Sequence, residues 1–320
     1  MLGDVIHSAD QPTSQTQTPN PHHLFSNATL NQLNERSNVK GLMHLAGHLF
    51  VMGVSGYLWA TQRETLWIAL PALVVYGFSF ASMFAPMHEC SHRTAFRNQK
   101  LNEIVGWCAG LLSFYNSAFF RRYHKWHHRY TQIPGKDPER DDPLPQTMGD
   151  YLFQLSGIPW WIGKIKTHFK VATGQLQAFY FISESAYAEV IRSTRLQLLT
   201  YAGAIALSTA FGHPEFVFLY WLLPLAIGQP ILRFVLLAEH TGCTQDENPL
   251  TNTRTTHTLF PLRFLMWNMP YHAEHHLYPS IPFHALAIAH QSLAPHLVHI
   301  GQGYTQVNQA IVSAFGSETE

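Results

Sequence analysis

Charged residues are scarce in this sequence. Only 12% of its 320 residues are Asp, Glu, Lys or Arg, and 20 basic residues balance 20 acidic ones, so the formal net charge is zero. A neutral chain lacks the positive surface that nucleic-acid binding requires, so we expect no nucleic-acid partner. Hydrophobic residues reach 46% and aromatic residues 13%. This composition is typical of an integral membrane protein.

Cysteine is rare as well. Cys90, Cys108 and Cys243 form no CxxC pair, and any bridging scheme leaves one of them unpaired. The count argues against a disulfide framework and predicts a reducing compartment for the part outside the membrane. Residues 1–40 contain no apolar core that follows basic residues and precedes a small-residue cleavage site. We therefore expect no signal peptide.

Four apolar runs predict an all-α integral membrane protein with four transmembrane helices in two hairpins. Leu42 to Ala60 pairs with Leu66 to Met87, and Leu196 to Phe211 pairs with Phe216 to Ala238, each across a short polar turn. Runs of this length cross a hydrocarbon core of about 30 Å, although Leu196 to Phe211 is short. The alternative for the second pair is a buried helical hairpin of a soluble protein.

One membrane domain is expected at residues 41–300. A flexible N-terminal tail is expected at 1–40, where Ser, Thr, Gln, Asn and Pro dominate, and a C-terminal tail at 301–320. The apolar run Ile104 to Phe120 is predicted to be re-entrant or interfacial, because a crossing there would place the histidines at 88–92 and those at 124–128 on opposite sides of the membrane. In Tyr151 to Lys170, paired tryptophans beside lysines predict a helix on the bilayer surface.

The distribution of basic residues predicts the orientation. Nine basic residues lie between Arg93 and Arg140, whereas the two short turns carry only Arg63. By the positive-inside rule the segment 93–140 is cytoplasmic, and so are both termini and the helical cap that carries the histidines.

Three histidine clusters lie beside the apolar runs, at residues 88–92 (HECSH), 124–128 (HKWHH) and 272–276 (HAEHH). On a helix, residues three and four apart share a face, so each cluster aims its imidazoles at one point. Imidazole binds iron, copper and zinc well. Eight such ligands exceed the four of a tetrahedral zinc and indicate two metal ions side by side. His240, at the end of the last apolar run, is either a ninth ligand or a helix-capping residue.

These histidines also admit other interpretations. A single buried histidine is more often a hydrogen-bonded core residue than a ligand, so the case rests on the joint pattern of the three clusters. HECSH formally matches the H-E-x-x-H motif of zinc proteases. The two HxxHH clusters on the same predicted membrane face make a mononuclear zinc site the poorer account.

The clusters resemble the histidine boxes of the membrane fatty acid desaturase superfamily, HxxxH, HxxHH and HxxHH, in the same order around four membrane helices. The stretch 267–282, WNMPYHAEHHLYPSIP, is similar to the third box, and the resemblance covers about residues 40–295. It implies a diiron centre, molecular oxygen as co-substrate and removal of hydrogen from an unactivated carbon. The ligands that it implies are His88, His92, His124, His127, His128, His240, His272, His275 and His276.

The sequence departs from the family pattern at one position. Acyl-CoA desaturases of this superfamily carry an Asn four residues before the isolated histidine, where this chain has Leu236, with Glu239 nearby. The resemblance also implies an external electron donor, ferredoxin-like or similar, because 320 residues leave no room for a fused haem-binding module. Candidate groups that orient the imidazoles are Glu89, Asp137, Glu239, Glu274 and Asn268.

The sequence leaves three functions to consider. The first is an oxygen-dependent desaturase that removes two hydrogens from a fatty acyl chain or other aliphatic substrate entering from the bilayer. The second is a membrane diiron hydroxylase or ketolase acting on a lipid, a carotenoid or a small metabolite, which would use the same boxes. The third, a histidine-rich metal-binding or transport protein, requires ionisable residues deep inside several helices. Leu66 to Met87 has none, so the third ranks last.

Overall fold

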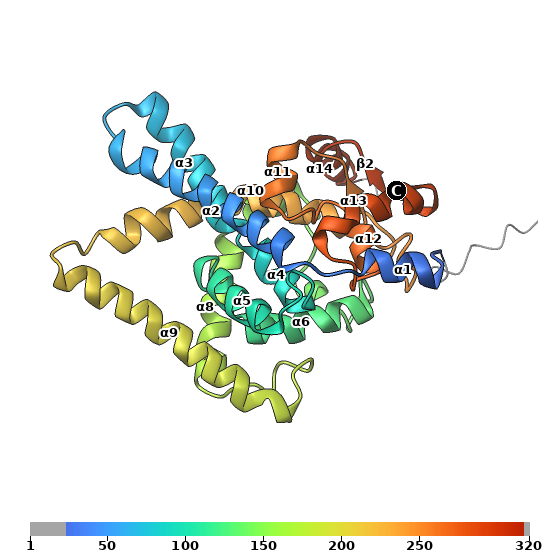
Figure 1. Cartoon of the computed structure of the whole chain (residues 1–320), viewed down its shortest axis with the longest axis horizontal. Helices are drawn as coiled ribbons and strands as arrows, with labels where there is room; N and C mark the ends of the chain where they lie inside the picture. The colour runs from blue at the N-terminus through green and yellow to red at the C-terminus, as the bar shows by residue number, and fades with distance from the viewer. Residues whose placement is uncertain (1–23, 317–320) are drawn as a thin grey trace, which may run out of the picture.

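The computed structural model describes residues 24–316, which are almost entirely helical (Figure 1). The regular strands within this range are β1 Thr255–Thr256 and β2 Ile300–Gly301, which pair in parallel. The all-α prediction is confirmed for the described residues. The α-helices are α1 Asn27–Leu33, α2 Asn38–Thr61, α3 Leu66–Ala81, α4 Phe84–His92, α5 Gln99–Leu112, α6 Ser117–Tyr130, α7 Met148–Leu155, α8 Ile158–Ala172, α9 Tyr187–Ala210, α10 Leu223–His240, α11 Phe260–Leu265, α12 His272–Leu277, α13 Phe283–Leu293 and α14 Tyr304–Ser313.

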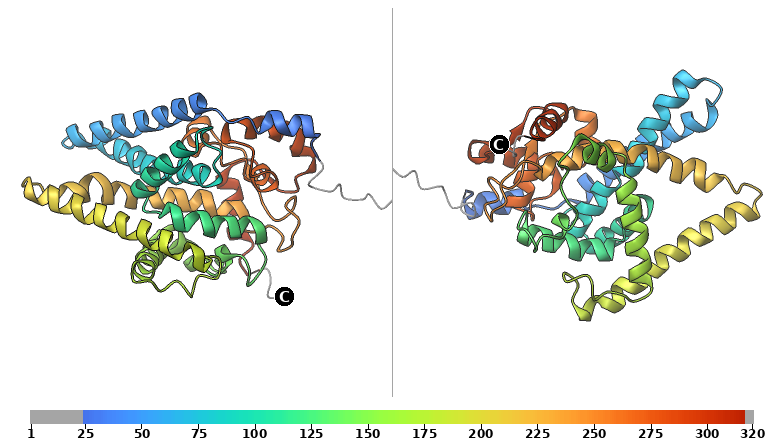
Figure 2. Two further views of the ribbon diagram at one scale, coloured as in Figure 1. Left: turned by 60° about the horizontal axis from the view of Figure 1, so that its bottom comes forward. Right: turned by 180° about the vertical axis from the view of Figure 1, so that it is seen from behind.

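Three helical stretches are long and apolar enough to cross a membrane. They are Asn38–Thr61, Leu66–His92 and Phe218–His240, the last beginning with a π-helical turn at Phe218–Leu222. These match three of the four predicted spans and support an integral membrane protein. In the left view of Figure 2, α2, α3, α9 and α10 extend toward one end of the molecule, and the C-terminal helices lie at the other end.

The fourth predicted span is not confirmed. Leu196 to Phe211 forms only the second half of α9, and α9 is not among the three stretches with spanning character. Its first half carries Glu189, Arg192 and Arg195, which lower its hydropathy, and Glu189 pairs with Arg122 of α6 at 2.6 Å. The first half of α9 is therefore attached to the helical cap rather than to the hairpins.

The helix α3 packs between α2 and α10, and it approaches α10 at a pair of glycines. A β-carbon at Gly228 would overlap the carbonyl of Gly77, and a β-carbon at Gly77 would overlap the carbonyl of Pro224. Small residues let helix backbones come this close in a membrane. The contact fixes α10, and with it His240 at its end, relative to α4, which continues from α3.

The predicted interfacial run Ile104 to Phe120 is divided between two short helices. α5 ends at Leu112 and α6 begins at Ser117, and Phe114 between them adopts a positive φ of 62°. The side chain of Asn116 caps α6 by accepting a hydrogen bond from the amide of Phe119 at 2.9 Å. This turn lets the chain double back against α4, so that the first two histidine clusters lie on the same side.

Both predicted tails contain a helix within the described residues. α1 packs against α13, and Asn308 of α14 donates a hydrogen bond to the carbonyl of Phe234 in α10 at 3.0 Å. The tyrosine hydroxyl of Tyr151 also donates to Asn308 at 2.8 Å. Residues 27–33 and 304–313 are thus helical, and residues 1–23 and 317–320 of the predicted tails lie outside the described residues. The domain boundaries stay a prediction.

Candidate metal centre

Four segments bring all nine predicted histidines together. α4 carries two of them, α6 three, α12 three, and His240 is the last residue of α10. His92 and His128 are half-buried, and the other seven are buried. Each cluster was predicted to aim its imidazoles at one point. This holds for α4, whereas α6 and α12 present their imidazoles to the same interior region but divide them between two adjacent groups.

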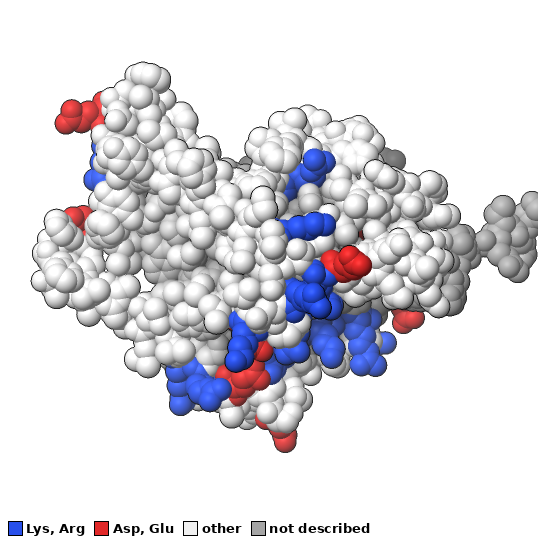
Figure 3. All heavy atoms as spheres, in the orientation of Figure 1, with Lys and Arg blue, Asp and Glu red and all other residues white. Residues whose placement is uncertain are grey.

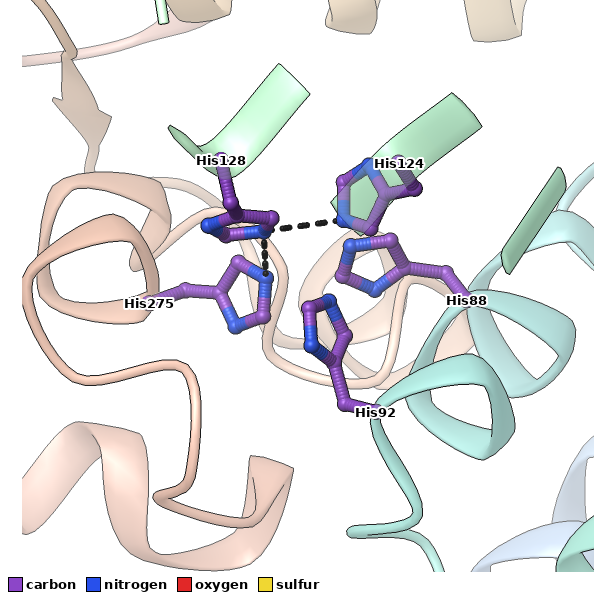
Figure 4. Close-up of side chains that lie close together, drawn as sticks. All are labelled: His88, His92, His124, His128 and His275. Carbon is purple, nitrogen blue, oxygen red and sulfur yellow. Dashed lines mark hydrogen bonds between the residues drawn. The ribbon is translucent and has the colours of Figure 1, made fainter. Parts of the chain in front are cut away.

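Five imidazoles form a first histidine group. Their ring nitrogens all lie within 4.8 Å of one another, and Figure 4 shows the five rings facing a common centre. The Nε2 atom of His128 lies 2.9 Å from Nε2 of His124 and 3.0 Å from Nε2 of His275. The group consists of His88, His92, His124, His128 and His275.

The other four imidazoles form a second histidine group. Ring nitrogens of His127, His240 and His276 lie within 4.8 Å of one another. His272 joins them, since its Nε2 is 3.1 Å from Nε2 of His240 and 3.2 Å from Nε2 of His276. The rings of His128 and His276 stack with centroids 4.2 Å apart, so the two groups are adjacent.

In three imidazoles of the second group, hydrogen bonds determine which ring nitrogen carries the proton. Nδ1 of His240 lies 3.1 Å from the carbonyl of Asn252, which only accepts, so this Nδ1 carries the proton. Nδ1 of His127 likewise donates to Asp137, at 2.9 and 3.0 Å. Thr131 donates its hydroxyl proton to the carbonyl of His127, so its oxygen accepts from Nδ1 of His276 at 3.1 Å. All three rings therefore turn an unprotonated Nε2 toward one another.

Such an arrangement of lone pairs suits a metal ion. The nitrogens of His88 and Nε2 of His127 are buried and have no hydrogen-bond partner. A buried polar atom left unpaired costs about 1–3 kcal/mol, and neighbouring unprotonated nitrogens cannot satisfy one another. A bound cation removes both penalties. The nine residues thus fit two metal ions, one in each group.

Burial keeps most of these imidazoles neutral. For five histidines outside the candidate membrane spans, the pKa of the ring lies well below its ordinary value. Burial is the larger cause, and neighbouring imidazoles are the second. A neutral ring binds a metal ion without first losing a proton. The residues concerned are His124, His128, His272, His275 and His276.

His127 is the exception. Burial lowers its pKa, but the carboxylates of Glu139 and Asp137 outweigh burial and raise the pKa above the ordinary value. Asp137 is fully buried and also accepts hydrogen bonds from the amides of Gln132 and Glu139 at 2.8 and 3.0 Å. These bonds hold the carboxylate in place, and with it the ring of His127.

Two further carboxylates approach the second group. Oε2 of Glu239 lies 3.5 Å from Nε2 of His272, and Oε2 of Glu139 lies 3.7 Å from Nε2 of His127. Glu239 is 7% exposed, and its Oε1 has no hydrogen-bond partner. Both acids thus face the side of the imidazoles on which the metal would lie. Leu236, where the family pattern has Asn, lines the adjacent cavity and offers no polar atom.

The remaining predicted orienting residues serve other roles. Glu89 accepts hydrogen bonds from Thr94 and from the amide of Phe283, and its nearest approach to His88 is 3.9 Å. Glu274 bonds Thr255 and His290. Asn268 donates to a carbonyl of the chain. None of the three hydrogen-bonds a histidine of either group.

Sequence reasoning missed three contributors to the site. Thr131 and the carbonyl of Asn252 orient imidazoles, and Glu139 approaches His127. Thr131 lies one helical turn beyond His127, and Glu139 lies two residues beyond Asp137. These local relations were available in the sequence. The carbonyl of Asn252 belongs to a loop and carries no residue-type signal.

A cavity of about 730 Å³ adjoins the histidines. His88, His124, His127, His240 and His272 form part of its wall. Beside them the wall is partly aromatic and partly charged. The aromatic residues include Phe84, Tyr115, Phe120 and Trp160, and the charged residues include Glu139, Lys164, Arg233 and Glu239.

Comparison with known proteins agrees with these features. The sequence model described as fatty acid desaturase matches residues 65–308, about three quarters of the chain. The dihydrorhizobitoxine desaturase of Bradyrhizobium elkanii is 26% identical over 273 residues, which cover 81% of this chain and 77% of that protein. The sn-1 oleoyl-lipid 12-desaturase of a Picosynechococcus strain is 26% identical, covering 71% of this chain and 69% of that protein. The Delta(5) fatty acid desaturase of Caenorhabditis elegans is 24% identical over 68% of this chain, and the match spans 55% of its own length.

Proposed function

The chain belongs to the fatty acid desaturase family of membrane oxidoreductases, and from this membership we propose that it is an oxygen-dependent desaturase. It removes two hydrogens from an aliphatic substrate at a diiron centre. The first iron is held by His88, His92, His124, His128 and His275, and the second by His127, His240, His272 and His276.

The observation that carries this proposal is the convergence of the two histidine groups. In the second group, three imidazoles are held by separate acceptors so that each presents an unprotonated Nε2 to the others. Such orientation is costly unless a metal ion uses the lone pairs. The identity of the metal as iron comes from the family.

The overall reaction balances with an external reductant. The substrate loses one hydrogen from each of two adjacent carbons, which form a double bond. Dioxygen takes up these two hydrogens with their electrons, together with two electrons from a donor protein and two protons from solvent, and leaves as two waters. We propose a ferredoxin-like protein as the donor. When bound, the iron pair would supply oxygen activation and the oxidising power for breaking the C–H bonds.

The chain itself would position the reactants and exclude water. The ring of Phe120 stacks on His124 with centroids 5.0 Å apart, and Phe84 lies 5.4 Å from Phe120 and 5.9 Å from His88. These rings form an apolar part of the cavity wall beside His88 and His124 of the first group. A substrate carbon against this wall would lie beside the metals and away from solvent.

We also propose that the site and both termini are cytoplasmic. In Figure 3, most Lys and Arg side chains gather over the centre and the lower part of the molecule, away from the hairpin corners at its left. The outer ends of the hairpins, 61–65 and 212–215, contain Arg63 as their only Lys or Arg residue. The positive-inside rule supports this orientation.

Mass spectrometry of cells expressing the chain or its His275→Ala variant tests the function. We expect a product two hydrogens lighter than its precursor in cells with the native chain and none with His275→Ala. His213→Ala is the control, because His213 lies exposed at the corner between α9 and α10, outside both groups. A histidine-dependent product one oxygen heavier would replace desaturation by hydroxylation.

Metal analysis of the purified protein tests the centre separately. We expect two irons per native chain and fewer in His275→Ala. A folded native chain without iron after reconstitution with ferrous salt would overturn the diiron proposal.

A further inference from the structure

The cavity beside the metal centre contains two cationic side chains that form no ion pair. Lys164 projects from α8 and Arg233 from α10, and both line the cavity. Within the described residues, no carboxylate oxygen lies within 4.0 Å of the ammonium of Lys164 or the guanidinium of Arg233. Unpaired cations are costly in a partly buried site, so the pair requires an explanation.

Arg233 is held in place but remains unsatisfied. One terminal nitrogen donates to the hydroxyl of Tyr115 at 3.2 Å, and the guanidinium carbon lies 5.8 Å from the centroid of the Trp160 ring. Its Nε is buried and has no hydrogen-bond partner. Arg233 also belongs to a stretch with spanning character, where an ionised side chain usually faces a partner or a functional cavity.

Lys164 lies on the same aromatic residue. Its Nζ is 3.8 Å from the centroid of the Tyr115 ring, so the ring face stabilises the ammonium. Burial first and the nearby charge of Arg233 second lower the pKa of Lys164 to about 7, against the carboxylates of Glu139 and Asp142, which line the same cavity and raise it. The two cations thus repel each other, and an anion between them would relieve the repulsion.

Tyr115 completes a set of hydrogen-bond donors. Its hydroxyl oxygen accepts from both Arg233 and the indole N–H of Trp160, the latter at 3.0 Å. Because these two groups can only donate, the hydroxyl proton of Tyr115 remains to be donated elsewhere. An ammonium, a guanidinium and a phenol therefore gather at one place in the cavity. This combination suits the oxygen atoms of an anion.

The donors lie close to the metal centre. The ring of Tyr115 is 5.7 Å from that of Phe120, which stacks on His124 of the first group. Only two aromatic contacts therefore separate the cations from an imidazole. A ligand anchored on the cations would place the carbons near its anionic group, rather than a remote acyl tail, against the histidines.

We propose that the substrate carries an anionic group, a carboxylate or a phosphate, which Lys164, Arg233 and Tyr115 bind while a short aliphatic portion reaches the histidines. The substrate is then a polar metabolite or a short-chain acid rather than a neutral membrane lipid. The reaction of this substrate rests on the proposed function, whereas the binding of the anion does not.

Binding of small probes tests the anion site without turnover. The purified, iron-loaded full chain is titrated with hexanoate, hexyl phosphate and neutral hexanamide by isothermal calorimetry. We expect hexanoate or hexyl phosphate to bind at least about tenfold more tightly than hexanamide, because charge-assisted hydrogen bonds favour the anions. Tighter binding of one anion identifies the class of head group. Equal affinity for hexanamide would overturn the proposal.

Three variants separate the anion site from a general change in the cavity. Lys164→Met keeps the aliphatic stem, Arg233→Gln removes the charge, and Tyr115→Phe keeps the ring, so all three should lose the preference for the anion. Lys166→Met is the control, because Lys166 is exposed on the same helix and does not line the cavity. Unchanged anion preference in Lys164→Met and Arg233→Gln, with native iron content, would contradict the assignment.

Solvent partition of the product gives an independent check. In the comparison with His275→Ala, we expect the histidine-dependent product in the aqueous extract, detected as an anion. A product in neutral membrane lipid would overturn this inference and leave the proposed desaturation intact. Conversely, anion binding without iron or product would leave this inference standing and count against the proposed function.

Discussion

At the scale of single residues, the second histidine group depends on which ring nitrogen carries the proton. His127, His240 and His276 each have Nδ1 bound to an oxygen that accepts. The three acceptors differ in kind, being a carboxylate, a backbone carbonyl and a hydroxyl. The hydroxyl of Thr131 donates its own proton to the backbone carbonyl of His127, which leaves its oxygen to accept from His276.

Replacing Thr131 by Val should weaken metal binding in the second group. The valine methyl cannot accept from His276, so the ring loses its fixed orientation, and loss of such a contact lowers metal affinity about 10–100-fold. Iron analysis after mild chelation should show close to one iron per chain in Thr131→Val. Thr131→Ser retains the hydroxyl and should keep two. Equal iron retention in both variants would show that Thr131 does not orient His276.

The neutral imidazoles also predict how the metal-free protein responds to acid. His124, His128, His272, His275 and His276 have folded-state pKa values well below 6.5, whereas in the unfolded chain they take up protons below about pH 6.5. The unfolded state thus binds more protons, so stability falls as pH decreases below about 6.5, by up to about 1.4 kcal/mol per pH unit for each group.

Thermal unfolding of the metal-free protein in detergent should therefore show a falling midpoint between pH 7 and pH 5.5. His275→Ala removes one of the five groups and should give a shallower slope. Bound metal should flatten the dependence until the ligands compete with protons. A midpoint independent of pH in the metal-free chain would contradict the assignment of these imidazoles as neutral.

At the scale of elements, the close crossing of α3 and α10 positions His240. The backbones meet at Gly77 and Gly228, where no β-carbon fits. Because α3 leads into α4 and α10 ends at His240, a displacement here would move one imidazole of the second group relative to two of the first. The crossing thus links membrane packing to the geometry of the metal centre.

Gly228→Val should destabilise this crossing. Inserting side-chain atoms into a filled contact typically costs about 1–3 kcal/mol, and here the backbones themselves must separate. We expect a lower apparent Tm in detergent and reduced iron content. Gly53→Val in α2 is the matched control, because nothing lies within 4 Å of a β-carbon at Gly53. Similar Tm values for the two variants would show that the crossing tolerates separation.

The elements also explain what could be predicted from the sequence. The histidine boxes are local patterns, and α6 and α12 present them on one face because the helical period fixes that face. The pairing of Lys164 with Tyr115 and Arg233 joins three separate segments, and no spacing records such a contact. The stretch Tyr151 to Lys170, which contains Lys164, was predicted as a helix on the bilayer surface, and that prediction stays untested. No pattern in the sequence indicated that the Lys164 side chain lines the cavity.

At the scale of the whole molecule, the topology depends on whether the second hairpin, α9 and α10, crosses the membrane. In α9 the apolar side chains of the outer half are exposed, with Leu199 at 69% and Leu207 at 59%. The inner half carries charges and pairs with α6. An exposed apolar outer half is expected of a helix that enters the bilayer, whereas about 15 residues rise only about 22 Å.

Cysteine labelling of intact cells distinguishes the two topologies. In a chain whose three cysteines are replaced by Ser, Glu64→Cys and Glu215→Cys place one thiol at each hairpin corner, and Lys166→Cys places one on the cap. If both hairpins cross the membrane, a membrane-impermeant maleimide should label both corners from outside, and Lys166→Cys only after lysis. Labelling of Glu64→Cys without Glu215→Cys would leave the α9–α10 corner inside the bilayer. Labelling of Lys166→Cys in intact cells would reverse the orientation proposed from the positive charges.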